Sequence, residues 1–167
     1  MTAVAGLELL SGCALHRVAA RDREHLLRMM AAAVVDNGHG KPSLVDALVE
    51  RERRFPTGLP TPVPCAIPHT DAIHVLHSGL AVATLAEPVM FAQMGGSGEE
   101  LPAQIVVLLC ITHPGEQVGA LQMVLARLSD QSPVEAVIRH ADPSSFESAV
   151  RNWLADSGTV GESAGAA

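Results

Sequence analysis

The stretch Gln104–Ile111 reads QIVVLLCI, in which seven apolar residues follow the glutamine without a break. A run that is apolar at every position is typical of a strand in the centre of a sheet whose two faces are both covered. A helix that spans a membrane would need about 20 such residues. We therefore predict a central β-strand at Gln104–Ile111.

Shorter strands are expected before this run, at Cys65–Ile67, Gly79–Ala86 and Val89–Ala92. The proline-rich segment Leu59–Pro64 is expected to be a loop. Gly95–Gly98 reads GGSG, which predicts a flexible connection between strands. It lacks the glycine spacing and the following lysine of a phosphate-binding loop, so a nucleotide site is not expected there.

Helices are predicted on both sides of these strands in the sequence. Apolar residues at helical spacing indicate helices from about Asp22 to Asn37 and from Ser43 to about Arg53. Three more are expected to follow, one beginning near Pro114, one with Ser132 as the N-cap of a capping box, and one from Asp142 to about Leu154. This order predicts an α/β fold, a single domain with a mixed β-sheet sandwiched between helices, without a regular βαβ alternation.

The length and composition narrow the classes of protein further. The chain has 167 residues, and we expect one domain over residues 1–155 followed by a flexible tail over 156–167. The net charge is −7 and Lys41 is the single lysine, which argues against a nucleic-acid partner. The three cysteines are widely spaced, which favours neither a disulfide framework nor a zinc ribbon. The N-terminal residues do not resemble a signal peptide, so we expect a soluble, cytoplasmic protein.

The first candidate for chemistry is His69, in the sequence Ala66-Ile67-Pro68-His69. A residue before proline is biased toward extended geometry, so Ile67 is expected to end a strand and His69 to stand where the chain leaves the sheet. A neutral imidazole is a good nucleophile near neutral pH. A histidine that only stabilises a turn is the structural alternative.

A metal site is a second alternative, because His74 and His77 follow His69 closely. The spacing is not that of an HExxH motif, and no nearby cysteine or glutamate completes a ligand set. No metal or cofactor is therefore expected, although three histidines in one loop leave the alternative open.

Two motifs at their relative spacing carry a resemblance to a known family. Arg51-Glu52 followed by Phe55-Pro56-Thr57-Gly58, and then Ala66-Ile67-Pro68-His69, are similar to the IIA component of the phosphoenolpyruvate-dependent sugar phosphotransferase system, in its fructose/mannitol superfamily. Within that superfamily the chain most resembles galactitol-type IIA proteins. The resemblance extends over about Leu7 to Leu154.

The resemblance implies roles for particular residues. It places the phosphorylated residue at His69, as a tele-phosphohistidine intermediate, and a phosphate partner at Arg51. Thr57 is expected to shape the pocket, and Asp71 either holds the second ring nitrogen of His69 or stabilises a turn. Gln117 stands where many family members have a second histidine, and nearby His113 is an alternative substitute for it.

The resemblance also implies partners. The family accepts a phosphoryl group from phospho-HPr and passes it to a IIB component, which serves a IIC membrane permease. The sequence does not name the sugar. A regulatory, nitrogen-type IIA protein that controls partners by its phosphorylation state is the alternative function. A shallow apolar docking face is expected around His69, with candidates at Val63, Ile73, Val75 and Leu76.

Overall fold

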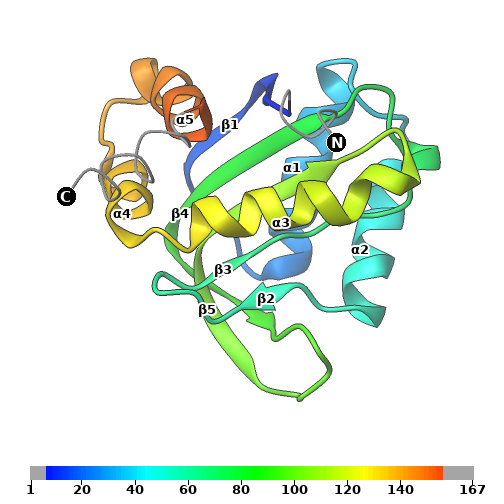
Figure 1. Ribbon diagram of the computed structural model, residues 1–167, viewed down its shortest axis with the longest axis horizontal. Coiled ribbons are helices and arrows are strands. Elements are labelled where there is room, and N and C mark those ends of the chain that lie inside the picture. Colours follow the sequence, from blue (N-terminus) through cyan, green and yellow to red (C-terminus); the bar gives the residue numbers. More distant parts are fainter. Residues whose placement is uncertain (1–6, 156–167) are drawn as a thin grey trace, which may run out of the picture.

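The computed structural model describes residues 7–155, so the tail predicted at 156–167 lies outside the described residues. Its centre is a five-stranded mixed sheet in the order β1-β4-β5-β3-β2 (Figure 1). The strands are β1 (Leu9–Val18), β2 (Gly58–Leu59), β3 (Cys65–Ala66), β4 (Gly79–Ala92) and β5 (Glu100–Cys110). β1 runs parallel to β4 and β3 runs parallel to β5, whereas the β4–β5 and β2–β3 pairs are antiparallel.

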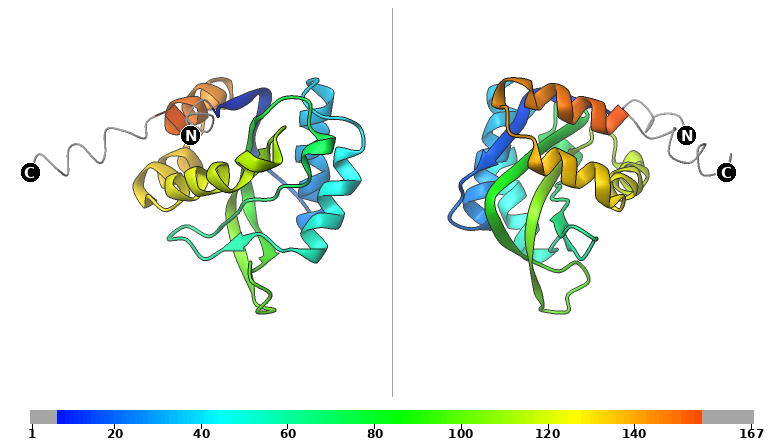
Figure 2. Two further views of the ribbon diagram at one scale, coloured as in Figure 1. Left: turned by 45° about the vertical axis from the view of Figure 1, so that its right-hand side comes forward. Right: turned by 90° about the vertical axis from the view of Figure 1, so that its left-hand side faces the viewer.

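Helices cover both faces of this sheet, as predicted (Figure 2). One face is covered by α1 (Arg23–Asp36) and α2 (Leu44–Arg54). The other is covered by α3 (Gln117–Leu128), α4 (Gln131–Arg139) and α5 (Phe146–Ala155). No helix among residues 7–155 is long and apolar enough to cross a membrane.

The apolar run of β5 supplies both layers of the core. Ile105, Val107 and Leu109 pack under α3–α5, while the alternating residues Val106 and Leu108 pack under α1 and α2. Successive side chains of a strand point to opposite faces. A strand that is covered on both faces must therefore be apolar at every position, which confirms the prediction of a central strand here.

The predicted order of elements was wrong at its beginning, because β1 precedes the first helix. Its pairing with β4 shifts register between Leu9 and Ala14 and again between Leu15 and Val18. Gly12 and Arg17 have positive φ angles of 78° and 49° in these irregular stretches. The shifts remove the two-residue alternation by which an edge strand is recognised from sequence.

Other predicted strand boundaries also differ from those in the structure. Gly79–Ala86 and Val89–Ala92 are one strand, β4, with an irregularity between Thr84 and Val89. The short strand β2 covers Gly58, where only a break was expected, and Leu59, which was predicted to begin the loop. The connection Gly95–Gly98 does join two strands, β4 and β5.

The helix starts were predicted with mixed success. Asp22 caps α1 by accepting a hydrogen bond from the main-chain N–H of His25 at 2.9 Å. The capping box at Ser132 is wrong, because α4 begins at Gln131 with Asp130 as its N-cap. Pro133 then lies in the first turn, where its missing N–H has no helical partner to lose. η3 (Pro114–Glu116) leads into α3, and η4 (Pro143–Ser145) leads into α5.

Candidate active site around His69

His69 lies where β3 leaves the sheet, as the sequence predicted. The main-chain N–H of Leu109 donates to the carbonyl of Pro68 at 2.9 Å, and His69 itself bridges to Leu109 in the parallel direction. The ring therefore stands at the carboxyl ends of β3 and β5. That edge of an α/β sheet is where side chains are free to meet a ligand.

The imidazole of His69 is held in one tautomer by the main chain. Its Nδ1 lies 2.9 Å from the carbonyl oxygen of Ile67. A carbonyl oxygen only accepts, so Nδ1 carries the hydrogen and the lone pair of the neutral ring is on Nε2. No residue in the described part of the chain forms a hydrogen bond with Nε2.

The electrostatic surroundings keep this ring neutral. Burial lowers the pKa of His69 below its ordinary value, and the positive charge of Arg51 lowers it further, against the opposing effect of the hydrogen bond to Ile67. Removing a cation from low dielectric and from a like charge favours the neutral form. These effects favour the neutral form of His69, in which the lone pair of Nε2 is available to attack an electrophile.

Asp71 does not hold the second ring nitrogen of His69, because that nitrogen is bonded to Ile67. The Asp71 carboxylate instead accepts a hydrogen bond from Arg51 at 3.3 Å, and its side chain is 75% exposed. A main-chain carbonyl has no signature in the sequence, which is why the partner of the ring was missed.

Arg51 reaches the site from α2, and its guanidinium is only partly paired. It bonds Asp71 and lies 4.9 Å from the centroid of the exposed Phe55 ring. Its Nε is buried and is the one buried side-chain nitrogen or oxygen of residues 7–155 without a hydrogen-bond partner. Leaving such a donor unsatisfied costs about 1–3 kcal/mol, which sets this guanidinium apart from the other buried polar side chains of the described residues.

Thr57 is buried behind the site and does not face it. Its main-chain N–H and its hydroxyl both donate to Glu52, each at 2.8 Å. The next residue, Gly58, has no room for a side chain, because a Cβ there would lie 2.7 Å from the carbonyl oxygen of Ala92. Sequence reasoning quoted Glu52 within a motif but gave it no role.

Gln117 is brought to the His69 loop by α3. It is the first residue of that helix, and its Nε2 donates to the carbonyl of Thr70 at 3.2 Å. His113 is exposed ahead of η3, and its ring has no hydrogen-bond partner among the described residues. The contact with the His69 loop is therefore made by the glutamine.

Exposed apolar side chains lie close to these residues in the chain. Ile73 and Leu76 are 68% and 48% exposed, which fits the expected docking face, whereas Val63 and Val75 are buried and do not belong to it. Two members were missed: Phe55 beside Arg51, and Val118 beside Gln117. We call Phe55, Ile73, Leu76 and Val118 the apolar rim.

The three histidines of the loop do not converge. The Nδ1 of His74 lies 2.8 Å from the hydroxyl of Ser43, and that of His77 lies 3.4 Å from the Nδ1 of His39. Within residues 7–155, no three or more His, Cys, Asp or Glu side chains form a group that could hold a metal ion. The structure thus contradicts a metal site built from His69, His74 and His77.

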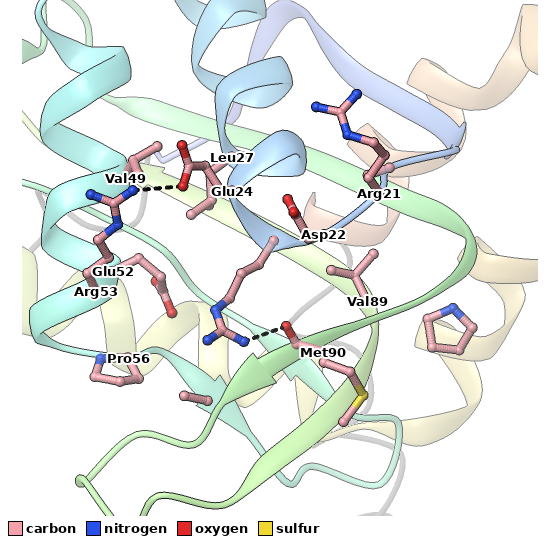
Figure 3. Close-up of a pocket in the computed structure, with 14 residues that line it drawn as sticks. Arg21, Asp22, Glu24, Leu27, Val49, Glu52, Arg53, Pro56, Val89 and Met90 are labelled. Atoms are coloured by element: carbon pink, nitrogen blue, oxygen red, sulfur yellow. Dashed lines mark hydrogen bonds and ion pairs between the residues drawn. The ribbon is translucent and has the colours of Figure 1, made fainter.

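A separate cavity of about 620 Å³ lies between α1, α2 and β4 (Figure 3). We call it the α1–α2 cavity. Its charged lining residues are Arg21, Asp22, Arg23, Glu24, Glu52 and Arg53. Arg23 donates to Glu100 at 2.7 Å and to the carbonyl of Met90 at 3.0 Å, and Arg53 donates to Glu24 at 2.8 Å. Most of this charge is thus satisfied inside the protein.

Comparison with known proteins gives both sequence relatives and structures of the same fold. The galactitol-specific EIIA component of the PTS system from Escherichia coli strain K12 is 27% identical over 118 residues, which cover 70% of this chain and 78% of that relative. The crystal structure of IIA mannitol from Escherichia coli matches with a TM-score of 0.70 at 20% identity, covering 86% of this chain and 99% of that one.

A second solved structure is the complex of enzyme IIA Mtl with phosphorylated enzyme IIB Mtl from Escherichia coli. It matches with a TM-score of 0.70 at 21% identity, covering 90% of this chain and 99% of that chain. At these identities the two structures establish the shared fold. A family model described as the phosphoenolpyruvate-dependent sugar phosphotransferase system, EIIA 2, matches residues 11–153. Since that match spans most of the 167 residues and includes the whole site around His69, this protein belongs to the EIIA 2 family of the phosphoenolpyruvate-dependent sugar phosphotransferase system.

Proposed function

We propose that this protein is a phosphocarrier that accepts a phosphoryl group from phospho-HPr on Nε2 of His69 and passes it to a cysteine of a IIB component. One observation carries the proposal. A neutral histidine with an unpartnered Nε2 stands within the electrostatic reach of Arg51, whose buried Nε has no partner among the described residues. An anionic group bound to Nε2 would lie in the positive field of the Arg51 guanidinium.

The chemistry balances without a metal. The lone pair of His69 Nε2 attacks phosphorus as the N–P bond of the donor phosphohistidine breaks, and the donor imidazole leaves. In the second step the IIB thiolate attacks the same phosphorus, and His69 returns to the neutral form. Phosphoryl transfer needs alignment and stabilisation of the equatorial oxygens. Arg51 supplies a guanidinium for those oxygens, and α3, which begins at Gln117 beside the His69 loop, adds the positive end of its helix dipole.

The tautomer suits this reaction. During attack Nε2 becomes bonded to phosphorus and the ring gains positive charge, while Nδ1–H still donates to Ile67. The hydrogen bond then strengthens, because a charged donor bonds more tightly than a neutral one. The apolar rim around His69 suits partners that dock in turn and leave again.

The likeness to galactitol-specific EIIA components supports a role in the uptake of galactitol or a related sugar. The test is a reconstituted relay of phosphoenolpyruvate, enzyme I and HPr with this protein, followed by intact mass and by 31P NMR. We expect one acid-labile phosphate, bonded to Nε2. Addition of a galactitol-type IIB should then discharge it. A protein that stays unmodified with its cognate HPr contradicts the phosphocarrier proposal, and one that is charged but never discharged by a sugar IIB contradicts the transport role.

A further inference from the structure

One buried carboxylate has no part in the transfer steps above. Glu52 follows Arg51 on α2, is only 5% exposed, and accepts two hydrogen bonds from Thr57, each at 2.8 Å. Its neighbour Thr57 is 2% exposed. Burial raises the pKa of Glu52 above its ordinary value, against the effect of those hydrogen bonds. Burying a carboxyl group costs free energy, so we ask what structural role Glu52 has in this position.

Hydrogen bonds lead from this pair to the imidazole of His69. The carbonyl of Thr57 accepts from the main-chain N–H of Ile67 at 3.2 Å, and the carbonyl of Ile67 accepts from Nδ1 of His69 at 2.9 Å. β2 and β3 are also paired directly, through Gly58 and Ala66. The peptide groups of residue 67 thus connect the buried Glu52–Thr57 pair to the reacting ring.

The same pair also fixes the last turn of α2. Arg51 and Glu52 are adjacent on the helix, so their side chains leave it about 100° apart. Glu52 bonds Thr57 beside the wall of the α1–α2 cavity (Figure 3), while Arg51 reaches Asp71 in the loop after His69. A rotation of this turn that moved Arg51 would break the bonds of Glu52.

We propose that Glu52 and Thr57 are positioning residues, which together set the tautomer and orientation of His69 and its placement relative to Arg51. The inference rests on the proposed function, since it assigns these residues a role in the same transfer. Reacting groups must be held to within a fraction of an ångström, and a misplacement of 1 Å can cost on the order of 100-fold in rate. Glu52 joins the helix that carries Arg51 to the strand pair that carries His69.

The test compares Thr57→Val with Thr57→Ser and with Thr84→Val as a matched control. Thr84 is also buried, at 1% exposure, and its hydroxyl accepts from the main-chain N–H of Arg17 at 3.0 Å. It lies on β4 opposite Ile105, away from the strand ends at His69. Three readouts are taken on each variant: the 15N NMR tautomer signature of unphosphorylated His69, the rate of transfer from phospho-HPr, and the midpoint of thermal unfolding.

We expect Thr57→Val to populate the Nε2–H tautomer of His69 and to lower the transfer rate roughly 10- to 100-fold. Thr57→Ser, which keeps the hydroxyl, should restore both readouts. Thr84→Val should lower the unfolding midpoint but leave tautomer and rate unchanged. If Thr57→Val does not fold, Glu52→Gln is measured instead, because the amide leaves the hydroxyl hydrogen of Thr57 without its charged acceptor.

The outcomes separate this inference from the proposed function. If the wild-type protein accepts phosphate normally and Thr57→Val matches Thr84→Val in tautomer and rate, the positioning role is wrong and the phosphocarrier role stands. If the wild-type protein accepts no phosphate, the phosphocarrier role fails, and the tautomer measurement still decides whether Glu52 and Thr57 orient the ring.

Discussion

The site around His69 and the α1–α2 cavity share the last turn of α2, yet they differ in how completely their polar groups are satisfied. The cavity is spacious and holds six charged residues, but Glu52, Arg23 and Arg53 are all bonded to other parts of the protein. In the site, Nε2 of His69 and Nε of Arg51 lack partners among the described residues.

If His69 is the reactive residue, as we propose, unmet hydrogen-bonding capacity identifies the site better than cavity volume does. A phosphoryl group needs a free nucleophile and free donors at a surface that a partner protein can reach. A cavity whose charged side chains are mostly paired within the protein offers neither. Four variants or conditions test the comparison, beginning with the one from which the largest effect is expected.

His69→Ala should abolish acceptance of the phosphoryl group, because the variant has no nucleophile at the strand ends. The fold should survive, since the ring is half-buried and its hydrogen bond is to the adjacent main chain. Intact mass after the relay reaction and far-UV circular dichroism measure the two expectations. Phosphorylation that persists in His69→Ala would place the reactive residue elsewhere and remove the basis of the comparison.

Arg51→Ala should slow transfer by about 100-fold, the typical loss when one preorganised donor to a developing charge is removed. The same change should raise the pKa of His69, because the charge of Arg51 holds that pKa down. Stopped-flow transfer and an NMR titration of the ring measure the two effects. Arg53→Ala, two residues further along α2 and in the cavity lining, is the control and should leave both values close to wild type.

Acidification should slow transfer at a lower pH than it would for an imidazole with an ordinary pKa. The folded pKa of His69 lies below the ordinary 6.5, so more than half of the rings are neutral at pH 6.5 and transfer should decline as the pH falls through the lower folded value. The same ring contributes stability that is fully present above pH 6.5 and is lost as the pH falls through its folded pKa. A rate–pH profile whose acid limb is centred above 6.5 would contradict this order.

Arg21→Ala should have the smallest effect. Arg21 is one of the lining residues, and its guanidinium has no hydrogen bond or ion pair to any residue of 7–155, so the free energy of unfolding should change by no more than about 0.5 kcal/mol. Transfer from phospho-HPr should be unchanged. A clear loss of transfer in Arg21→Ala, seen in the same stopped-flow assay, would show that the α1–α2 cavity takes part in function. The site around His69 would then not be the only part of the protein that transfer requires.

Much of the fold followed from patterns within a few residues. The apolar run of β5 and the spacing in α1 and α2 predicted a sheet between helices, and the structure confirms it. β1 was not predicted, because its irregular pairing with β4 leaves no regular alternation of apolar and polar residues in the sequence. The start of α4 was misplaced because Ser132 suits an N-cap in isolation, whereas the chain already turns into the helix at Gln131.

The sequence by itself determined that a histidine leaves the sheet after a proline, since the restriction that proline places on Ile67 acts between neighbours. Tertiary structure alone decided what that histidine can do. Arg51 and Asp71 are 20 residues apart, and Gln117 and Thr70 are 47 apart, yet each pair is bonded. Such contacts depend on how the two helical layers pack on the sheet, and the carbonyl that sets the tautomer of His69 belongs to the main chain, which every sequence shares.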